Sequence, residues 1–331
     1  MPVIAALLLI PLIGFFYEAA GTRRDRNRLT PRGALVDCHG RRQYLHNEGA
    51  GAPPVVLEAG IAGTSLGWAI VQPKIATFTT VYSYDRAGLG WSDPARSDRT
   101  LANITLELRS LLESAAVPSP YVLVGHSFGG LLVRAFACRW PELVVGLILV
   151  DPVSVTAWAT ASASERARLR RGVAFSRRGA TLARFGVVRG ALTLLLSGAR
   201  RLPKLIGRAA AGKGSPTMER LVGEVRKLPP EVWPMIRAHW CKAKSFEAMA
   251  EYLDCLPTCA TEAVALRPRP EIPVTILSAS SATPAELIER DEWAAQSNSG
   301  KHVRLENSGH WIQLDAPDAV VAAVRELIQS L

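Results

Sequence analysis

The sequence predicts an α/β protein with a mostly parallel sheet, helices on both faces of that sheet, and a helical insertion between two of its strands. From residue 34 onward, short apolar runs of strand length alternate with segments of helical periodicity, which is typical of parallel strands joined by crossover helices. Residues 153–265 break this alternation, because they are helical in pattern, rich in arginine and without strand signals. The alternation resumes near residue 266, so we expect both flanking parts to form one sheet.

The overall composition is that of an ordinary globular protein. The 331 residues are enough for one large α/β domain with an insertion, or for two small domains. Hydrophobic residues make up 48% of the chain and charged residues 21%, which excludes wholesale disorder.

The cysteines predict neither a disulfide framework nor a zinc site. The five cysteines are scattered, odd in number and form no C-x-x-C pair, which fits a reducing compartment. Cys255 and Cys259 lie four residues apart with no histidine close by, so we expect them to be packing residues. The sequence therefore implies no metal ion and no organic cofactor.

The first thirty residues differ from the rest of the chain. Pro2 to Tyr17 is apolar, and Glu18 is the single charge before Arg23. Carried on to Thr22, this segment is long enough to cross a bilayer, and the arginines that follow it would keep the body of the protein on the cytoplasmic side. We therefore expect residues 1–30 to be a membrane anchor with a basic flank.

Two other interpretations of this N-terminal segment stay open. It could be an uncleaved helix that lies in the membrane interface. A secretory signal peptide fits less well, because no basic region precedes the apolar run and no convincing cleavage site follows it.

The net charge of +10 is concentrated in the helical insertion. Between residues 152 and 227, sixteen Lys or Arg side chains stand against three Glu. Basic residues mixed with apolar ones suit an anionic membrane surface, and a solvated outer face of a lid explains them equally. Because the N-terminus is apolar, we favour a membrane as the partner and expect no nucleic acid.

The elements of the predicted sheet follow one another in order. Strands are expected at residues 34–38 and 42–46, which form a hairpin around Gly40, and at 53–60, 79–85, 121–125, 146–152, 272–278 and 302–306. Helices are expected from Leu101 to Ala115 after a candidate cap at Asp98, from Ser127 to Trp140 before Pro141, and at 285–296 and 317–331.

A G-x-S-x-G sequence, Gly125 to Gly129, identifies a candidate nucleophile. A strand precedes it and a helix follows it, which is the context that exposes the hydroxyl of Ser127 on a tight turn. A serine needs a base, because its own pKa is far too high for it to ionise at pH 7. His310 in "NSGHWIQLDAP" follows the last strand and is the candidate base. The remaining histidines belong to the first hairpin, the turn itself, the insertion and a strand: His39, His46, His126, His239 and His302.

Acyl transfer also needs donors for a developing oxyanion. One is the backbone N–H of Phe128, the residue after the nucleophile. The other is assigned to Ile61 in "LEAGIAGTSLGW", where Gly60 and Gly63 let the chain turn towards the site. Glu58 precedes this loop, and we expect it to pair with a nearby arginine or a loop amide.

These motifs resemble the α/β-hydrolase superfamily. "YDRAGLGWSDP", "GHSFGG", "LILVDP" and "NSGHWIQLDAP" are similar to its prolyl-iminopeptidase, epoxide-hydrolase and esterase branch, over about residues 34–331. The resemblance implies an α/β-hydrolase core at residues 31–152 and 266–331, with residues 153–265 as an arginine-rich lid. The serine argues against the epoxide hydrolases and dehalogenases of this fold, which use an aspartate at that position.

Two positions depart from the family pattern. The usual His-Gly of the oxyanion loop is Ala59-Gly60, and no acid follows residue 277, where the carboxylate that holds the histidine usually lies. Asp151 ends the strand after the nucleophile, and some members of the superfamily place their acid there. Asp151 is therefore the preferred acid, although it could also cap the chain that enters the lid. The other candidates are Glu286, Asp291 and Asp85, whereas Asp315 is expected to cap the last helix.

The combined prediction is a serine hydrolase of carboxylesterase or lipase type, with Ser127, His310 and Asp151 as its catalytic triad. We expect it to cleave a hydrophobic carboxylic ester through an acyl-serine intermediate. An acyltransferase or an aminopeptidase could use the same residues. A non-catalytic binding protein that kept the fold is the alternative that the missing acid favours.

Overall fold

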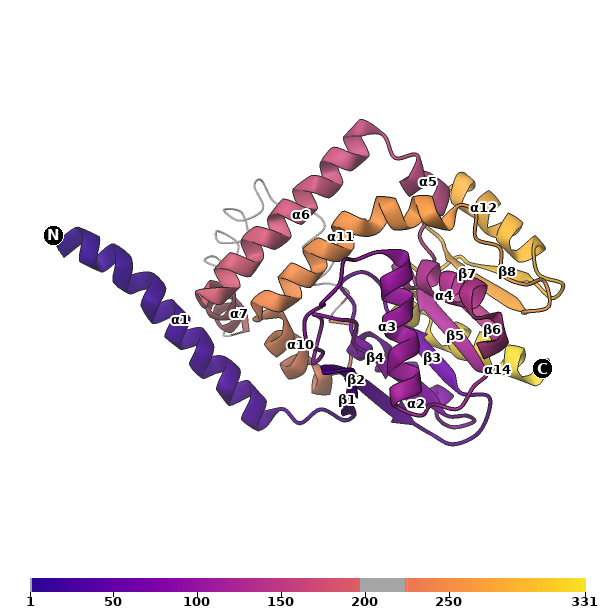
Figure 1. The fold of residues 1–331 in the computed structure, drawn as a ribbon, viewed down its shortest axis with the longest axis horizontal. Helices are drawn as coiled ribbons and strands as arrows, with labels where there is room; N and C mark the ends of the chain where they lie inside the picture. Colours follow the sequence, from indigo (N-terminus) through magenta and orange to yellow (C-terminus); the bar gives the residue numbers. More distant parts are fainter. Residues whose placement is uncertain (1, 197–223, 225) are drawn as a thin grey trace.

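The sheet has eight strands in the order β1-β2-β4-β3-β5-β6-β7-β8. The computed structural model describes residues 2–196, 224 and 226–331 (Figure 1). The strands are β1 (Ala34–Cys38), β2 (Arg41–Glu48), β3 (Val55–Glu58), β4 (Val81–Tyr84), β5 (Tyr121–His126), β6 (Val144–Val150), β7 (Val274–Ala279) and β8 (Lys301–Leu305). β2 runs antiparallel to β1 and to β4, and every other pairing is parallel. The predicted mostly parallel sheet is confirmed.

Helices cover both faces of the sheet, which explains why the central strands are apolar on both sides. All residues of β3, β5 and β7 are buried, as expected for parallel strands between two helical layers. One apolar core lies under α3 (Leu101–Ser114), α4 (Phe128–Arg139) and α12 (Pro284–Ala295). A second core lies under η1 (Ser65–Trp68), α2 (Gln72–Ile75), α13 (Ile312–Asp315) and α14 (Pro317–Gln329). A short 3-10 turn, η2 (Pro141–Leu143), joins α4 to β6.

Thr100, rather than the predicted Asp98, caps α3. The Thr100 hydroxyl accepts a hydrogen bond from the main-chain N–H of Asn103 at the first turn of this helix.

The helical insertion leaves the sheet after β6 and returns at β7. Its elements are α5 (Val155–Ala159), α6 (Ala163–Arg184), α7 (Val187–Leu196), η3 (Pro230–Val232), α10 (Trp233–Trp240) and α11 (Ala243–Ala263). α6 and α11 lie side by side (Figure 1). A Cβ at Gly179 would come within 2.5 Å of the Phe246 ring, so the close approach of these two helices requires glycine there. Residues 197–223 and 225 of the basic stretch lie outside the described residues.

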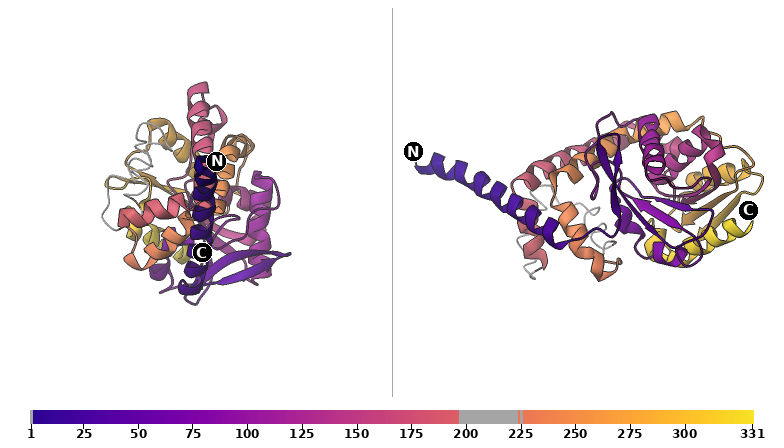
Figure 2. Two further views of the ribbon diagram at one scale, coloured as in Figure 1. Left: turned by 90° about the vertical axis from the view of Figure 1, so that its left-hand side faces the viewer. Right: turned by 60° about the horizontal axis from the view of Figure 1, so that its bottom comes forward.

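The first helix, α1 (Pro2–Arg28), packs against the insertion. Figure 2 shows α1 extending away from the sheet, with the chain termini at opposite ends of the molecule. Its C-terminal half is tied to α7 by Arg189, whose Nε lies 2.8 Å from Glu18 Oε2 and whose Nη1 lies 2.7 Å from Asp25 Oδ2. All three side chains are buried. Gly14 of α1 and Gly186 before α7 let the two segments approach closely.

The prediction of a membrane anchor over residues 1–30 is wrong. Among the helices of residues 2–196, 224 and 226–331, none is long and apolar enough to cross a bilayer. In α1 the apolar run ends at Glu18, and Glu18 and Asp25 form buried ion pairs with the insertion. The assignment of the protein to a membrane, with its body on the cytoplasmic side, is corrected accordingly, and a membrane partner is not supported.

Candidate active site

Ser127 occupies a strained turn between β5 and α4. Its backbone has φ 54° and ψ −118°, a region that costs a non-glycine residue on the order of 1–3 kcal/mol. The neighbouring glycines make this turn possible. A Cβ at Gly125 would lie 2.5 Å from the carbonyl oxygen of Gly129, and a Cβ at Gly129 would lie 2.6 Å from that of Glu58. The G-x-S-x-G sequence therefore forms the strand-turn-helix geometry that aims a serine hydroxyl out of the sheet.

His310 lies between Ser127 and Asp151. Its Nε2 is 3.0 Å from Ser127 Oγ, and its Nδ1 is 2.6 Å from Asp151 Oδ2. This geometry suits a neutral imidazole that donates its Nδ1 proton to the carboxylate and accepts the serine proton at Nε2. The three residues predicted from separate parts of the sequence are thus brought into one hydrogen-bonded chain.

Asp151 directly follows β6, and its carboxylate is held on both oxygens. Its backbone has a positive φ of 41°, which aspartate tolerates better than most residues, and its N–H donates to the carbonyl of Leu277 at 2.7 Å. Oδ1 accepts hydrogen bonds from the N–H of Ala279 at 3.0 Å and from Arg290 Nη1 at 2.9 Å. This leaves Oδ2 directed at His310.

The environment keeps Asp151 ionised. Burial on its own would raise the pKa of this carboxyl group. The hydrogen bond to His310, the charge of Arg290 and the N–H of Ala279 outweigh burial, and the pKa of Asp151 lies below its ordinary value.

The competing acids lie in other contacts. Glu286 is in the first turn of α12, where its carboxylate accepts from the N–H and hydroxyl of the N-cap Thr283. Asp291 binds His302 at 2.6 Å, and Arg304 also donates to it. The structure places both acids on the helix after β7, as the sequence predicted, and in the described part of the chain neither carboxylate contacts His310.

Asp85 and Asp315 support loops around the site. Asp85 accepts from the N–H of Ser65 at 2.8 Å and from that of Trp91 at 2.9 Å. Asp315 was predicted to cap the last helix, but the residue at that N-cap is Ala316. Asp315 Oδ2 instead accepts from the N–H of Gly309 at 2.8 Å, so it holds the turn that carries His310.

The loop with the predicted oxyanion donor packs against the nucleophile. A Cβ at Gly60 would lie 3.4 Å from Ser127 Cβ and 3.1 Å from His126 Nδ1, a fit too tight for an easy substitution. Ile61 is the next residue. In the described part of the chain, no residue accepts a hydrogen bond from the N–H of Ile61 or of Phe128. Both donors are therefore free to face a ligand.

Arg86 holds this loop by its carbonyl oxygens, a contact that the sequence analysis missed. The buried guanidinium donates to the carbonyls of Ala59 at 2.5 Å, of Gly60, and of Ile61 at 2.8 Å. It also pairs with Glu58, which confirms the predicted arginine partner of that acid. Burial raises the pKa of Glu58 to about 7 in spite of this pairing. Since the carbonyls point to Arg86, the N–H groups of the loop point elsewhere.

His126, at the end of β5, contacts the main chain of His310. Its Nε2 lies 2.9 Å from the carbonyl oxygen of His310, and the two rings lie 4.8 Å apart. Burial lowers the pKa of His126 to about 3, so the ring is neutral at pH 7 and donates its Nε2 proton. The side chain of His126 is buried and points into the fold.

The described residues offer no obvious metal site. Within residues 2–196, 224 and 226–331, no group of three or more His, Cys, Asp or Glu side chains is arranged to hold a metal ion. Cys255 and Cys259 are free thiols that pack in or against the larger core.

Comparison with known proteins relates both the sequence and the fold to hydrolases. The model of the family described as "Alpha/beta hydrolase family" matches residues 49–323. Protein YqjL of Bacillus subtilis (strain 168) is 36% identical over 107 residues, which are 32% of this chain and 42% of YqjL. An AB hydrolase superfamily protein of Gibberella zeae is 37% identical over 103 residues, 30% of this chain and 32% of that protein. The chain thus spans less than half the length of these curated relatives.

Solved structures share the fold at low sequence identity. An alpha/beta hydrolase fold protein from Burkholderia ambifaria has a TM-score of 0.62 at 23% identity, covering 89% of this chain and 99% of that one. A thermophilic esterase from Thermogutta terrifontis has a TM-score of 0.58 at 19% identity, over 91% and 98% of the two chains. The epoxide hydrolase CorEH has a TM-score of 0.59 at 21% identity, over 91% and 99%.

Proposed function

The chain belongs to the alpha/beta hydrolase family, and from that premise we propose that it is a serine hydrolase that cleaves a carboxylic ester through an acyl-serine intermediate. The observation that carries the proposal is the chain of contacts from Ser127 Oγ to His310 Nε2 and from His310 Nδ1 to Asp151 Oδ2. A serine on the strained turn favours acyl chemistry over epoxide opening, because the epoxide hydrolases of this fold use an aspartate nucleophile there.

In the proposed first step, His310 Nε2 takes the proton of Ser127 as Oγ attacks the ester carbonyl carbon. The negative charge that develops on the carbonyl oxygen is stabilised by the N–H groups of Ile61 and Phe128. Asp151 stabilises the imidazolium and keeps its Nδ1 proton in place. The tetrahedral intermediate then expels the alkoxide, which takes the proton from His310, and an acyl-serine remains.

The second step repeats this chemistry with water. His310 removes a proton from the water as its oxygen attacks the acyl carbon. The same two N–H donors stabilise the second oxyanion. Collapse returns the proton to Ser127 Oγ and releases the carboxylic acid, which regenerates the free enzyme.

The helical insertion is the proposed lid over this site, with residues 31–152 and 266–331 as the core. Tyr252 of α11 is fully buried, and its ring lies 6.2 Å from that of Phe128, the residue after the nucleophile. The Tyr252 hydroxyl also donates to the carbonyl of Ala87 at 3.3 Å. These contacts support a lid that rests on the loops around Ser127.

A hydrophobic substrate is supported by the apolar contact between lid and core. Val232, Met235 and Ile236 of the lid pack with Leu66 and Leu314 of the core. Leu66 follows the loop that carries Ile61, and Leu314 follows His310 in the chain. This apolar cluster thus includes residues close in the chain to Ile61 and to His310, which suits a substrate with an alkyl or acyl chain.

A fluorophosphonate probe tests the proposal directly. We expect the folded wild-type protein to be labelled at Ser127 and to hydrolyse p-nitrophenyl esters, with higher kcat/KM for octanoate than for acetate. The Ser127→Ala variant should do neither. Folded wild-type protein that is not labelled would overturn the proposal and favour a binding protein. Labelling with turnover only after an alcohol acceptor is added would identify an acyltransferase.

A further inference from the structure

A buried arginine, Arg290, contacts the carboxylate of the proposed triad from outside it. Arg290 lies on α12 and is 2% exposed. Its Nη1 is 2.9 Å from Asp151 Oδ1 and 2.8 Å from Ser278 Oγ, and its Nη2 is 2.7 Å from the carbonyl oxygen of Pro152. Arg290 therefore binds both the side chain of Asp151 and the main chain of the next residue, Pro152.

The two carboxylate oxygens of Asp151 bind different partners. Oδ1 is occupied by Arg290 and by the N–H of Ala279, while Oδ2 is the oxygen that meets His310. Rotation of the carboxylate would break two charge-assisted or main-chain hydrogen bonds at once. The arginine thus fixes the direction in which Asp151 presents its lone pairs to His310.

A chain of hydrogen bonds holds Arg290 itself. Ser278 Oγ is 2.7 Å from His302 Nε2, and His302 Nδ1 is 2.6 Å from Asp291 Oδ1. Because Arg290 donates to Ser278 Oγ, the directions of the other hydrogen bonds in the chain follow. Arg290 donates to the oxygen of Ser278, the Ser278 hydroxyl donates to Nε2, and Nδ1–H donates to Asp291. Ser278 is fully buried, so this second Ser-His-Asp set supports Arg290 and is not a second nucleophile.

We propose that Arg290 is a positioning residue for ester hydrolysis, which orients Asp151 and balances the charge of its carboxylate. Asp151 serves in place of the acid that this family usually carries after β7. The inference rests on the proposed function, since a carboxylate needs this orientation only if it serves His310. Ser278 and Ala279 at the end of β7 supply the supporting contacts, and Asp151 after β6 supplies the carboxylate.

The charge of Arg290 gives the proposal a measurable pH dependence. The charged and titratable groups around Asp151 are His310 from the turn after β8, Arg290 from α12 and His126 from β5. Arg290 is among the causes that hold the pKa of Asp151 below its ordinary value. Without this charge, the hydrogen-bonded pair of Asp151 and His310 takes up a proton at higher pH, so activity is lost earlier as the pH falls.

The test compares Arg290→Gln with Arg290→Lys by kcat and KM for a p-nitrophenyl ester across pH 4 to 9. For Arg290→Gln we expect kcat to fall on the order of 10- to 100-fold with little change in KM, well short of the roughly 10⁴-fold loss expected when the triad acid is disabled. The acid limb of its kcat/KM profile should also move to higher pH. Arg290→Lys keeps the charge, and we expect its acid limb to stay at the wild-type position.

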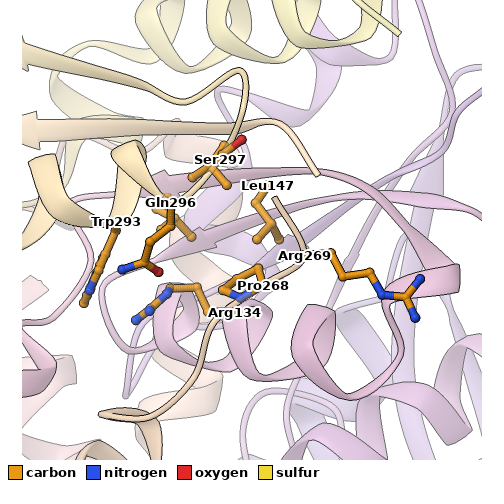
Figure 3. A pocket seen from close by; sticks show the side chains of 9 residues that line it. Arg134, Leu147, Pro268, Arg269, Trp293, Gln296 and Ser297 are labelled. Carbon is orange, nitrogen blue, oxygen red and sulfur yellow. The ribbon is translucent and has the colours of Figure 1, made fainter. Parts of the chain in front are cut away.

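Arg134→Gln is the matched control for loss of a buried arginine. Arg134 is also 2% exposed, and its guanidinium lies 3.8 Å from the ring of Trp293 on the same helix as Arg290. Figure 3 shows it near Trp293 and Gln296, with which it lines a small pocket. In the described part of the chain, Arg134 forms no hydrogen bond or ion pair with Asp151 or His310, so its loss should leave the acid limb in place.

The outcomes separate this inference from the proposed function. An Arg290→Gln variant with the wild-type acid limb, in protein that is labelled by the fluorophosphonate probe, would overturn the role of Arg290 alone. An equal fall in rate at every pH for Arg290→Gln, Arg290→Lys and Arg134→Gln would show a purely structural role and also overturn it. A wild-type protein that is never labelled would overturn the proposed function together with the inference.

Discussion

The Oδ1 atom of Asp151 lies 3.0 Å from the main-chain nitrogen of Ala279, so the ends of β6 and β7 meet at one carboxylate. The two strands pair in parallel up to Val150 and Leu277, and the N–H of Asp151 continues that pairing to the carbonyl of Leu277. The proposed acid, Asp151, therefore lies one strand away from the position usual in this family, yet its carboxylate is bound by the end of the strand that usually bears the acid.

Ser127→Ala and His310→Ala should each abolish ester hydrolysis without unfolding the protein. We expect kcat to fall by about 10⁴-fold or more, with a residual rate from the oxyanion donors and substrate binding. Ser299→Ala and His39→Ala remove the same groups from exposed side chains and should keep wild-type turnover. Steady-state kinetics and circular dichroism check both points, and near wild-type turnover by purified Ser127→Ala would contradict the mechanism.

Asp151→Asn should cost far more activity than changes to the other candidate acids. The amide can no longer fix the tautomer of His310 or stabilise its imidazolium, a loss on the order of 10⁴-fold in kcat. Glu286→Gln keeps the capping box of α12, and Asp291→Asn changes an exposed side chain, so each should lower kcat only slightly. The reverse ranking in kcat would move the acid back to the segment after β7.

Arg86→Lys should lower kcat with little effect on KM. A lysine can reach one or two of the carbonyl oxygens of the Ala59 to Ile61 loop but cannot hold all three, so the N–H of Ile61 would lose its orientation. Loss of one oxyanion donor costs on the order of 10²- to 10³-fold, and we expect part of that loss.

Arg99→Lys is the matched control for Arg86→Lys. Arg99 is also buried and also faces the ring of Tyr252, but its guanidinium binds Glu107 and Ser97 instead of the oxyanion loop. Both variants should unfold at lower urea concentrations than the wild type. If both lost kcat to the same extent, Arg86 would act through general packing and not through the loop.

The stability of the protein should fall between pH 6.5 and pH 4, in part because of His239. This side chain is 2% exposed, and in the described part of the chain neither ring nitrogen has a hydrogen-bond partner. Burial, helped by Lys242 and Lys244, lowers the pKa of His239 to about 3. The unfolded state takes up a proton near pH 6.5 and the folded state does not, so each pH unit below 6.5 costs about 1.4 kcal/mol until about pH 3.

His239→Phe removes this titration and keeps the aromatic contact with Trp91, whose ring lies 4.9 Å away. Between pH 6 and pH 4, we expect the free energy of unfolding, measured with urea, to change less steeply with pH in the variant than in the wild type. The difference in slope should correspond to about one bound proton. His39→Phe, on the exposed hairpin, is the control and should keep the wild-type slope. An unchanged slope in His239→Phe would show that this ring is protonated or hydrated in the folded protein.

The parts of the fold set by local pattern could be predicted, and those set by distant charges could not. The buried strands and the turn at Ser127 follow from apolar runs and glycines that are close together in the chain. The roles of Arg86 and Arg290 depend on partners far away in sequence; Asp151 and Arg290 are 139 positions apart. One signal was present for Arg290, because it lies on a helix face with Trp293 and Ala294, where a charge needs a buried partner.

The prediction for the N-terminal segment failed for the same reason. Its apolar composition predicted an anchor, but Glu18 pairs with Arg189, 171 positions later. A hydropathy pattern records neither that partner nor the packing of Gly14 against the main chain of Phe185. The prediction for Asp315 failed for a local reason. Its carboxylate binds the N–H of Gly309 in the nearby turn instead of capping the last helix.

The ion cluster of Arg189, Glu18 and Asp25 makes the first helix an integral part of the folded body. A shortened chain that begins at Thr30 would lack both carboxylates, and the guanidinium of Arg189 would lose its ion-pair partners together with the helix that covers it. The loss would fall on α7 and α6, which both pack against α1, and α6 in turn lies beside α11, the helix whose Tyr252 contacts Phe128. Trimming the N-terminus to ease purification would therefore alter the packing of the helical insertion, and kinetic comparisons should be made on a chain that keeps α1.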